Sequence, residues 1–164
     1  MEQGTDRRWM ILAVFALVAV GIVGAILIGR AGGEDSSSTK TDTDTKPTVE
    51  VPDGAPPKEL VEQDLVEGTG PEAKSGDEVT VQYVGVGFES GEEFDASWGG
   101  EPFPFTLGTG GVIAGWDQGV EGMKVGGRRE LIIPPDLAYG PEGRPPAIGP
   151  NETLIFVIDL LEVK

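Results

Sequence analysis

The chain has 164 residues, with 12 Lys and Arg against 28 Asp and Glu, so its formal net charge is −16. It contains no Cys and no His. These absences exclude disulfide frameworks, Cys/His zinc sites, thiol nucleophiles and histidine general bases. The negative charge also argues against a nucleic-acid partner, because such proteins need a basic face to displace counterions from phosphate.

A segment of twenty uncharged residues runs from Trp9 to Ile28, with arginines on both sides. A helix rises about 1.5 Å per residue, so this segment would span about 30 Å, the thickness of a bilayer's hydrocarbon core. A cleaved signal peptide is the alternative, since Gly29 and Ala31 offer small residues to a peptidase, but signal h-regions are usually about 7–15 residues long. We therefore expect a short tail over residues 1–8 and an uncleaved transmembrane signal-anchor over residues 9–28.

The arginines before this segment weakly favour an N-terminus inside the cell. A single N-terminal anchor followed by a soluble domain is a common arrangement for exported domains. We expect a single-pass protein of the cell membrane whose C-terminal domain lies outside the cytoplasm.

Residues 29–57 are acidic and rich in Ser, Thr, Gly and Pro, with almost no apolar side chain to bury. Such a composition cannot offset the entropy of ordering the chain, which predicts a disordered linker. Residues 58–164 carry seven basic and twenty acidic residues, or −13 of the total charge. At this length the segment can bury one compact core without metals or disulfides.

The first half of this domain alternates in the manner of β-strands. A weak strand is expected over residues 59–67, and a stronger one follows in which Val79, Val81 and Tyr83 share one face. Ser90-Gly91 predicts a hairpin turn into a strand around Phe94. Another short strand is expected over residues 103–107.

The second half contains one helical pattern, from Gly115 to Met123, and two more strands. The first of these strands contains Arg129, Leu131 and Ile133 and ends at a Pro-Pro pair; we interpret Arg128 and Arg129 as strand surface. In the last strand, residues 154, 156, 158 and 160 form one face, and residues 155, 157 and 159 form the other. The pattern predicts an α+β domain: a mainly antiparallel, curved sheet of about five strands wrapped around one short helix.

Several motifs occur together in this domain: VQYVGVGFESGEEFDAS, then PFPFTLGTGGVIAGWDQGVEGMKVGGRRELIIPPDLAYG, then TLIFVIDLLEV. In this order they resemble the FKBP-type peptidyl-prolyl cis-trans isomerases, from about Glu59 to Lys164. The resemblance implies an apolar pocket between sheet and helix. It also implies rotation of X–Pro peptide bonds, proline-containing polypeptide clients and a possible macrolide ligand of the rapamycin type. Together with the expected anchor and linker, it predicts an isomerase that assists the folding of exported proteins at the membrane. No metal and no cofactor is implied.

The resemblance assigns the pocket residue by residue. Trp116 matches the floor, and four aromatic residues match the walls: Tyr83, Phe94, Phe103 and Phe156. Val112 and Ile113 match the rim. The backbone N–H of Ile113 would donate a hydrogen bond to a substrate carbonyl. Asp95 matches a carboxylate at the pocket edge, and Tyr139 matches a hydroxyl that hydrogen-bonds the ligand. Of these, Phe94, Asp95 and Tyr139 are the expected catalytic residues.

Three positions depart from the usual family pattern. Arg144 stands where His is frequent, Pro146 where Gly is common, and Gly111 where an acidic residue precedes Val112 in other members. Two alternatives stay open at this point. Each aromatic residue, taken singly, is better explained as ordinary core. The domain as a whole could also be a non-catalytic, membrane-tethered module that binds proline-containing partners.

Overall fold

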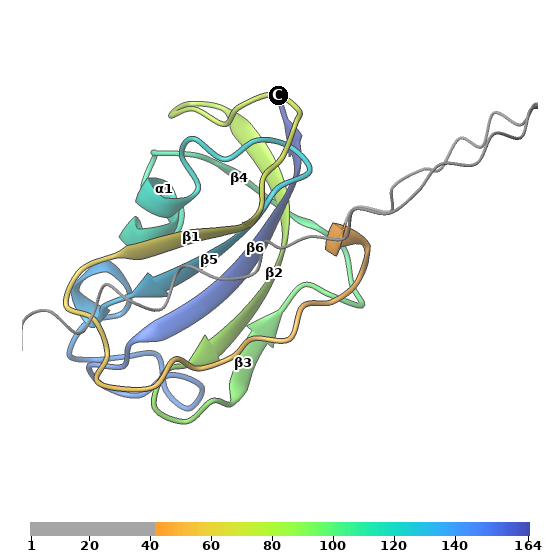
Figure 1. Ribbon diagram of the computed structural model, residues 1–164. Coiled ribbons are helices and arrows are strands. Elements are labelled where there is room, and N and C mark those ends of the chain that lie inside the picture. The colour runs from red at the N-terminus through yellow and green to blue at the C-terminus, as the bar shows by residue number, and fades with distance from the viewer. Residues whose placement is uncertain (1–41) are drawn as a thin grey trace, which may run out of the picture. The chain divides into compact units, whose positions relative to one another are not determined.

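The computed structural model describes residues 42–164 (Figure 1). The expected tail and signal-anchor, and residues 29–41 of the expected linker, lie outside the described residues. Within the described part, no helix is long and apolar enough to cross a membrane. The elements in chain order are the 3-10 turn η2 (Asp42–Asp44), β1 (Val61–Val66), β2 (Glu78–Gly87), β3 (Glu93–Ala96), β4 (Phe103–Thr106), α1 (Ala114–Gly119), β5 (Arg128–Ile133), the 3-10 turn η3 (Pro135–Leu137) and β6 (Leu154–Val163).

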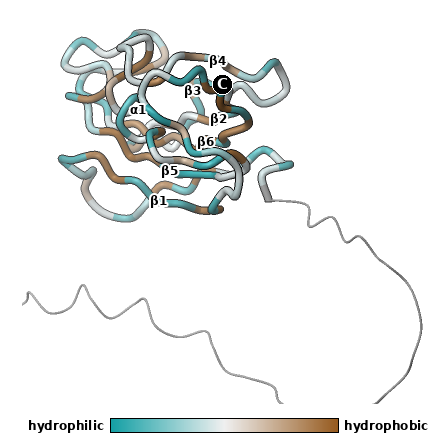
Figure 2. Tube along the Cα trace, turned by 90° about the horizontal axis from the view of Figure 1, so that it is seen from above, coloured by the Kyte–Doolittle hydropathy of each residue, from teal (hydrophilic) through white to brown (hydrophobic). Residues whose placement is uncertain are grey.

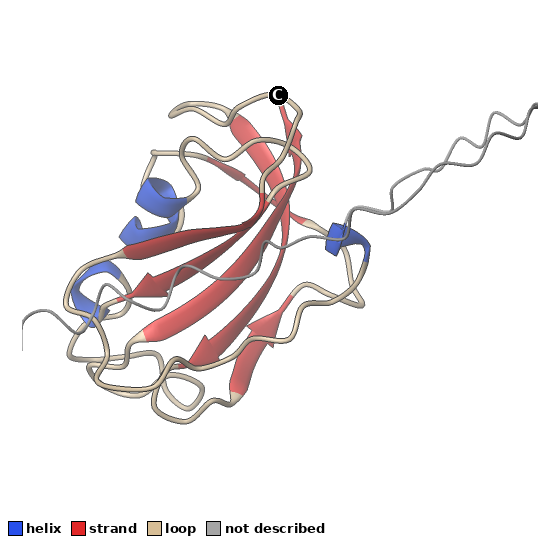
Figure 3. Ribbon diagram, viewed as in Figure 1, coloured by secondary structure: helices blue, strands red, loops and turns tan. Residues whose placement is uncertain are grey.

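The strands form one antiparallel sheet in the order β1-β5-β6-β2-β3, and β4 pairs with β2 as well (Figure 3). Both β3 and β4 lie along the same strand, β3 opposite Val84–Val86 and β4 opposite Glu78–Val81. The predicted antiparallel sheet with one short α-helix is confirmed, with six strands in place of about five.

Successive side chains of a strand point to opposite faces of the sheet, and the buried apolar residues accordingly form two layers. Figure 2 shows hydrophobic and hydrophilic residues following one another along the chain. On β2, Val79 and Val81 belong to the layer that also contains Trp116 of α1, whereas Val84 and Val86 belong to the layer on the opposite face. The predicted faces of β6 divide in the same way: residues 154, 156, 158 and 160 pack in the layer with Trp116, and Ile155 packs in the other. We call these the inner and outer layers.

The helix α1 is shorter than predicted, because it ends at Gly119 and Val120 is already its C-cap. Gly122, with φ of 80°, then turns the chain away. The helix lies close against β5: a Cβ on Gly115 would overlap with Ile133, and one on Gly119 would lie 2.6 Å from both terminal methyl carbons of Leu131. The glycines therefore set how closely Trp116, between them, approaches the sheet.

The segment before β1 contacts the sheet at several residues. Residues 42–57, here called the N-terminal strap, run past β3 toward β1 as the orange and gold part of Figure 1. Lys46 forms an ion pair with Glu93 on β3 at 2.8 Å, and Val49 packs against the outer layer. The packed part of the chain thus begins before Lys58. One apolar residue, one lysine and one main-chain carbonyl make these contacts, and none of them stands out in the composition.

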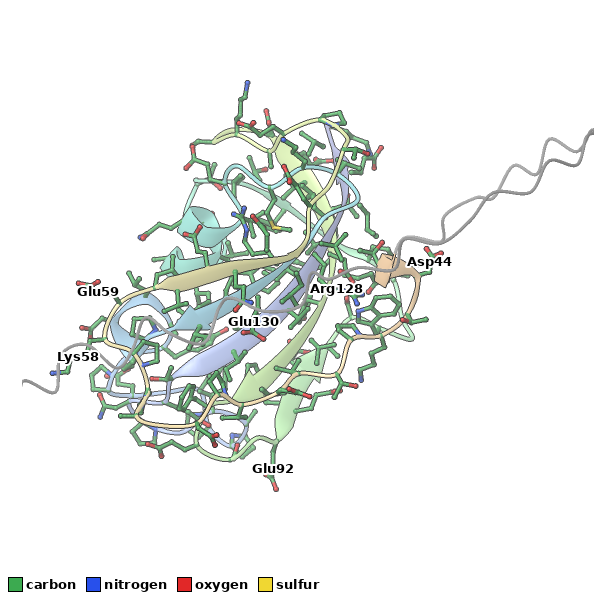
Figure 4. All side chains as sticks on the ribbon, viewed as in Figure 1. Asp44, Lys58, Glu59, Glu92, Arg128 and Glu130 are labelled. Atoms are coloured by element: carbon green, nitrogen blue, oxygen red, sulfur yellow. The ribbon has the colours of Figure 1, made fainter. Side chains whose placement is uncertain are left out.

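Arg128 and Arg129 are buried, which corrects their interpretation as strand surface. Arg128 binds both carboxylate oxygens of the fully buried Asp159, at 2.5 and 2.8 Å, and donates to the Thr45 carbonyl of the strap. Figure 4 shows it beside η2, at the end of the sheet. Arg129, on the opposite face, binds Asp64 of β1 and the Gly119 carbonyl at the end of α1. Each guanidinium is buried because carboxylate and carbonyl partners satisfy it.

Candidate active site

A cavity of about 510 Å³ opens between α1 and the inner face of the sheet. All nine predicted site residues line it: Tyr83, Phe94, Asp95, Phe103, Val112, Ile113, Trp116, Tyr139 and Phe156. They come from β2, β3, β4, the loop before α1, α1 itself, the turn after η3, and β6. The structure therefore brings residues more than seventy positions apart in the chain to a single site, while their individual roles stay predictions.

Trp116 lies at the bottom of the cavity with 4% of its surface exposed. Its ring contacts Tyr83, Phe156 and Phe105 at centroid distances of 5.0, 5.2 and 5.6 Å, the first two edge to face. Edge-to-face pairs at such distances stabilise the ring position beyond simple burial. Phe105, which the sequence indicated only as a strand residue, thus supports the floor from behind.

The wall on the β3 side is a pair of rings, Phe94 and Phe156, with centroids 5.5 Å apart. They meet above Gly85 of β2, where a Cβ would lie 2.7 Å from Phe156 and 2.8 Å from Phe94. Any side chain at Gly85 would push the rings apart. Phe103, with 40% of its surface exposed, lies at the opposite wall.

The β3 side of the cavity also contains a hydrogen bond between two side chains, which the sequence did not indicate. The Tyr83 hydroxyl donates to Asp95 Oδ2 at 2.8 Å. Burial, and then this bond to the Asp95 carboxylate, raise the pKa of the Tyr83 phenol well above its ordinary value. The hydroxyl therefore stays protonated at neutral and mildly alkaline pH and keeps the carboxylate in place.

Tyr139 reaches the cavity from the turn that follows β5. Pro134 and Pro135 end that strand and begin η3, after which Tyr139 packs against the inner layer. Its hydroxyl has no hydrogen-bond partner among residues 42–164, unlike that of Tyr83. Of the two tyrosines, Tyr139 is the one with a free donor for a ligand.

The loop before α1, which forms the rim, is held by Asp117, a residue that no sequence motif indicated. Its two carboxylate oxygens accept the backbone N–H groups of Gly108 and Gly110 at 2.8 and 2.9 Å. Ile113 follows as the extended N-cap of α1; its carbonyl accepts the Trp116 N–H, and its own N–H has no acceptor in the described part of the chain. The only signal in the sequence was an acidic residue in the first turn of the expected helix.

The remaining lining comes from Gly111, beside Val112, and from the loop after Tyr139, including Arg144 and residues 145–148. This loop is held by Ile148, which is buried in the inner layer and exchanges two backbone hydrogen bonds with Arg144. The sequence marked Arg144 and Pro146 as departures from the family pattern but not as pocket residues.

The cavity therefore combines an aromatic surface with polar groups at its edge: Asp95, Tyr139, Arg144 and the Ile113 N–H. Within residues 42–164 no group of three or more carboxylates is placed to hold a metal ion. The chain has no Cys or His. Such a site is suited to binding an apolar ring and to fixing one carbonyl by a hydrogen bond.

Comparison with known proteins agrees with this geometry. The model of the FKBP-type peptidyl-prolyl cis-trans isomerase family matches residues 70–161. An FK506-binding protein of Streptomyces anulatus is 61% identical over 120 residues, 72% of this chain and 97% of that protein. A probable FK506-binding protein of Corynebacterium glutamicum is 54% identical over 117 residues, 71% of this chain and 97% of that protein.

Solved structures show the same relationship. AtFKBP13 superposes with a TM-score of 0.61 at 40% identity, over 66% of this chain and 96% of that one. FkpA from Escherichia coli gives a TM-score of 0.58 at 46% identity, over 64% of this chain and 48% of that one. Sequence and fold agree over the residues that build the cavity, and the chain belongs to the FKBP-type peptidyl-prolyl cis-trans isomerases.

Proposed function

We propose that this isomerase acts at the membrane, held by an N-terminal anchor, and that it assists the folding of exported proteins. Two features support the proposal: the uncharged segment Trp9–Ile28 and the complete aromatic cavity that follows it in the same chain. An isomerase domain tethered outside the cytoplasm would meet polypeptides as they emerge unfolded.

The chemistry needs no nucleophile. An X–Pro bond rotates over a barrier of about 18–20 kcal/mol because amide resonance keeps it planar. In the twisted transition state the resonance is lost and the carbonyl is less polar. An apolar cavity therefore stabilises the twisted form relative to the planar one better than water does, which is differential binding of the transition state. An acceleration of about 10⁶ requires about 8 kcal/mol.

The roles we propose follow from the contacts. The proline ring lies over Trp116, whose position is fixed by the surrounding rings. The substrate carbonyl accepts the free Ile113 N–H, and the Tyr139 hydroxyl binds the peptide from the other side. Asp95 acts by holding Tyr83, with its charge at the edge of the cavity. Holding the ring and the carbonyl together orients the bond that must rotate.

Phe94→Ala and Tyr139→Phe in the full-length chain test these roles. We expect Phe94→Ala to reduce kcat/KM at least about tenfold, because a wall of the cavity is lost, and Tyr139→Phe to reduce it about threefold, equivalent to roughly 0.7 kcal/mol. Exchange spectroscopy by NMR on a proline-containing peptide gives the rates. Unchanged kcat/KM in both variants would show that these residues are not the site. Peptide binding without acceleration would identify a non-catalytic module instead.

The relatives named as FK506-binding proteins suggest a further ligand. We propose that a macrolide such as FK506 occupies the same cavity and competes with the peptide. Inhibition that follows a competitive pattern, and that weakens in the Phe94→Ala variant, is the expected result. Inhibition of equal strength in wild type and variant would place the macrolide elsewhere.

Membrane placement is tested on intact cells that produce the full-length chain. The expected result is that the protein sediments with membranes after a high-salt wash and that added protease removes the isomerase domain while a cytoplasmic marker survives. Protection of the domain in intact cells, with digestion after lysis, would place it inside. Release of the protein by the wash would show that no anchor is retained.

A further inference from the structure

The cavity has two charged side chains in its lining, Asp95 and Arg144, and they differ in how they are partnered. Asp95 already accepts a hydrogen bond from Tyr83. Arg144 forms no ion pair and no side-chain hydrogen bond with any described residue. By contrast, the two other arginines of the described chain, Arg128 and Arg129, are both bound to carboxylates. Arg144 is thus a positive charge in the lining that is paired with no carboxylate of the described residues, and Asp95 is the negative charge of the same lining.

The backbone at Arg144 is held by its surroundings, and its side chain is exposed. Its backbone exchanges two hydrogen bonds with Ile148, at 2.9 and 3.1 Å, and the Ile148 side chain is buried in the inner layer. The guanidinium carbon lies 5.9 Å from the centre of the Tyr139 ring, within the range of a cation–π contact. The charge is therefore held next to the residue that we expect to bind the peptide.

The rest of the molecule makes this charge unusual. Residues 58–164 carry seven basic against twenty acidic residues, so an acidic peptide is repelled by the domain as a whole. A carboxylate that enters the cavity meets Arg144 at short range, where a guanidinium offers paired N–H donors to carboxylate oxygens. The cavity, at about 510 Å³, has room for groups on either side of the proline ring.

We propose that Arg144 is a specificity-determining residue that favours substrates with an acidic side chain, Asp or Glu, directly beside the isomerised proline. It acts on the choice of substrate and not on the rotation itself, so peptides with a neutral neighbour depend little on it. The inference rests on the isomerase site described above and adds the substrate class to it.

The test compares matched peptides whose proline neighbour is Glu or its neutral isostere Gln, one pair with this residue before the proline and one pair with it after. All peptides have uncharged, blocked ends. NMR exchange spectroscopy with the full-length chain in a neutral detergent gives kcat/KM for each. The measured quantity is the Glu/Gln ratio within a pair, which cancels differences in protein stability and in the amount of active protein.

We expect Arg144→Gln to lower the Glu/Gln ratio about two- to fivefold in at least one pair, the size of effect that an exposed ion pair produces. Arg144→Lys should retain most of the ratio, because the charge is kept. Lys74→Gln is the matched control: it removes one positive charge from an exposed position outside the cavity lining, and it should leave the ratio unchanged.

An equal Glu/Gln ratio in wild type and Arg144→Gln, in both pairs, would overturn the proposal. An equal fall in the Lys74→Gln control would also overturn it, because the effect would then come from net charge. The Gln peptides separate this outcome from failure of the isomerase assignment: if wild type accelerates them, the enzyme is active whatever the ratio shows.

Discussion

At the scale of single residues, the fold buries an ion pair between two strands of the sheet. Arg128 and Asp159 form a pair whose members are 8% and 0% exposed, and Asp159 has a raised pKa because burial outweighs the stabilising guanidinium. A buried ion pair adds little to the free energy of unfolding compared with apolar residues of the same shape. Removing one member is nevertheless costly, because it leaves an uncompensated buried charge.

The pair yields a first prediction. Arg128→Leu should lower the free energy of unfolding by about 3 kcal/mol, because Asp159 is left buried without its partner. The double variant Arg128→Leu/Asp159→Leu should recover most of the loss. Urea denaturation at pH 7 measures both. If the double variant is no more stable than the single one, the cost lies in packing or in the lost bond to Thr45 and not in the unpaired charge.

At the scale of elements, the contact of α1 with β5 sets the cavity floor. Two opposing effects act on Gly115. Alanine at a helical position is favoured over glycine by about 0.5–1 kcal/mol, whereas overpacking a well-packed core costs about 1–3 kcal/mol. The added Cβ would overlap with the branched side chain of Ile133, which is fully buried and has nowhere to move. The cost of overpacking should therefore exceed the gain in helix propensity.

We expect Gly115→Ala to destabilise the protein by about 1–2 kcal/mol, as measured by urea denaturation. It should also reduce kcat/KM, because Trp116 moves with the helix. Gly100→Ala is the control, since its Cβ would meet only the Ser97 carbonyl at 3.5 Å and its φ is not positive. A Gly115→Ala variant as stable as the control would mean that the helix can shift without cost.

The strap meets β5 at a pair of acidic residues, which gives a pH-dependent prediction. The pKa of Glu130 on β5 is raised, first by burial and then by the negative charge of Glu50 in the strap. Glu130 lies on the outer face of the sheet, as Figure 4 shows. A raised folded-state pKa means that ionisation is less favourable in the folded protein, so stability falls as the pH rises from the unfolded value through the folded one.

Glu130→Gln removes this ionisation. The variant should melt at a higher temperature than wild type at pH 7.5, and the difference should disappear at pH 3, where Glu130 is protonated in both states. Differential scanning calorimetry at the two pH values measures the effect. A variant that is less stable than wild type at pH 7.5 would show that the Glu130 carboxylate contributes favourably there.

At the scale of the whole molecule, the strap joins the expected anchor to the folded domain and takes part in the fold. It supplies the Thr45 carbonyl to Arg128, Lys46 to Glu93, and Val49 to the outer layer. A fragment that begins at residue 58 lacks all three contacts and exposes part of the outer layer. The strap therefore also fixes where the connection to the N-terminal segment leaves the domain.

We expect the fragment of residues 58–164 to be less stable than that of residues 42–164 by about 2 kcal/mol, chiefly because Arg128 loses an acceptor and the outer layer loses apolar cover. Urea midpoints of the two fragments measure this difference. The cavity lies on the other face, so kcat/KM at low denaturant should be the same for both. Equal midpoints would mean that the strap contacts contribute nothing.

Most strands and the position of the short helix could be predicted from the sequence, and the resemblance of its motifs to the FKBP family indicated the nine residues that line the cavity. Alternation with a period of two assigns Val79 and Val81 to one face whatever the rest of the chain does, and the aromatic motifs keep their order along the chain. What it could not determine were the interactions that depend on distance in space. The Tyr83–Asp95 bond, the Asp117 clamp on the rim loop and the contacts of the strap are examples.

The physical reason is that a composition such as that of residues 42–57 cannot build a core of its own, but it can cover one that already exists. In the same way, Arg128 and Arg129 have the composition of surface residues and become buried because the topology brings Asp159 and Asp64 to them. The absence of Cys and His excluded thiol and histidine chemistry, and the resemblance to the FKBP-type isomerases then implied bond rotation in an aromatic pocket. The three-dimensional fold decides which arginines have a carboxylate partner: Arg128 and Arg129 do, whereas Arg144 in the cavity lining has none among the described residues.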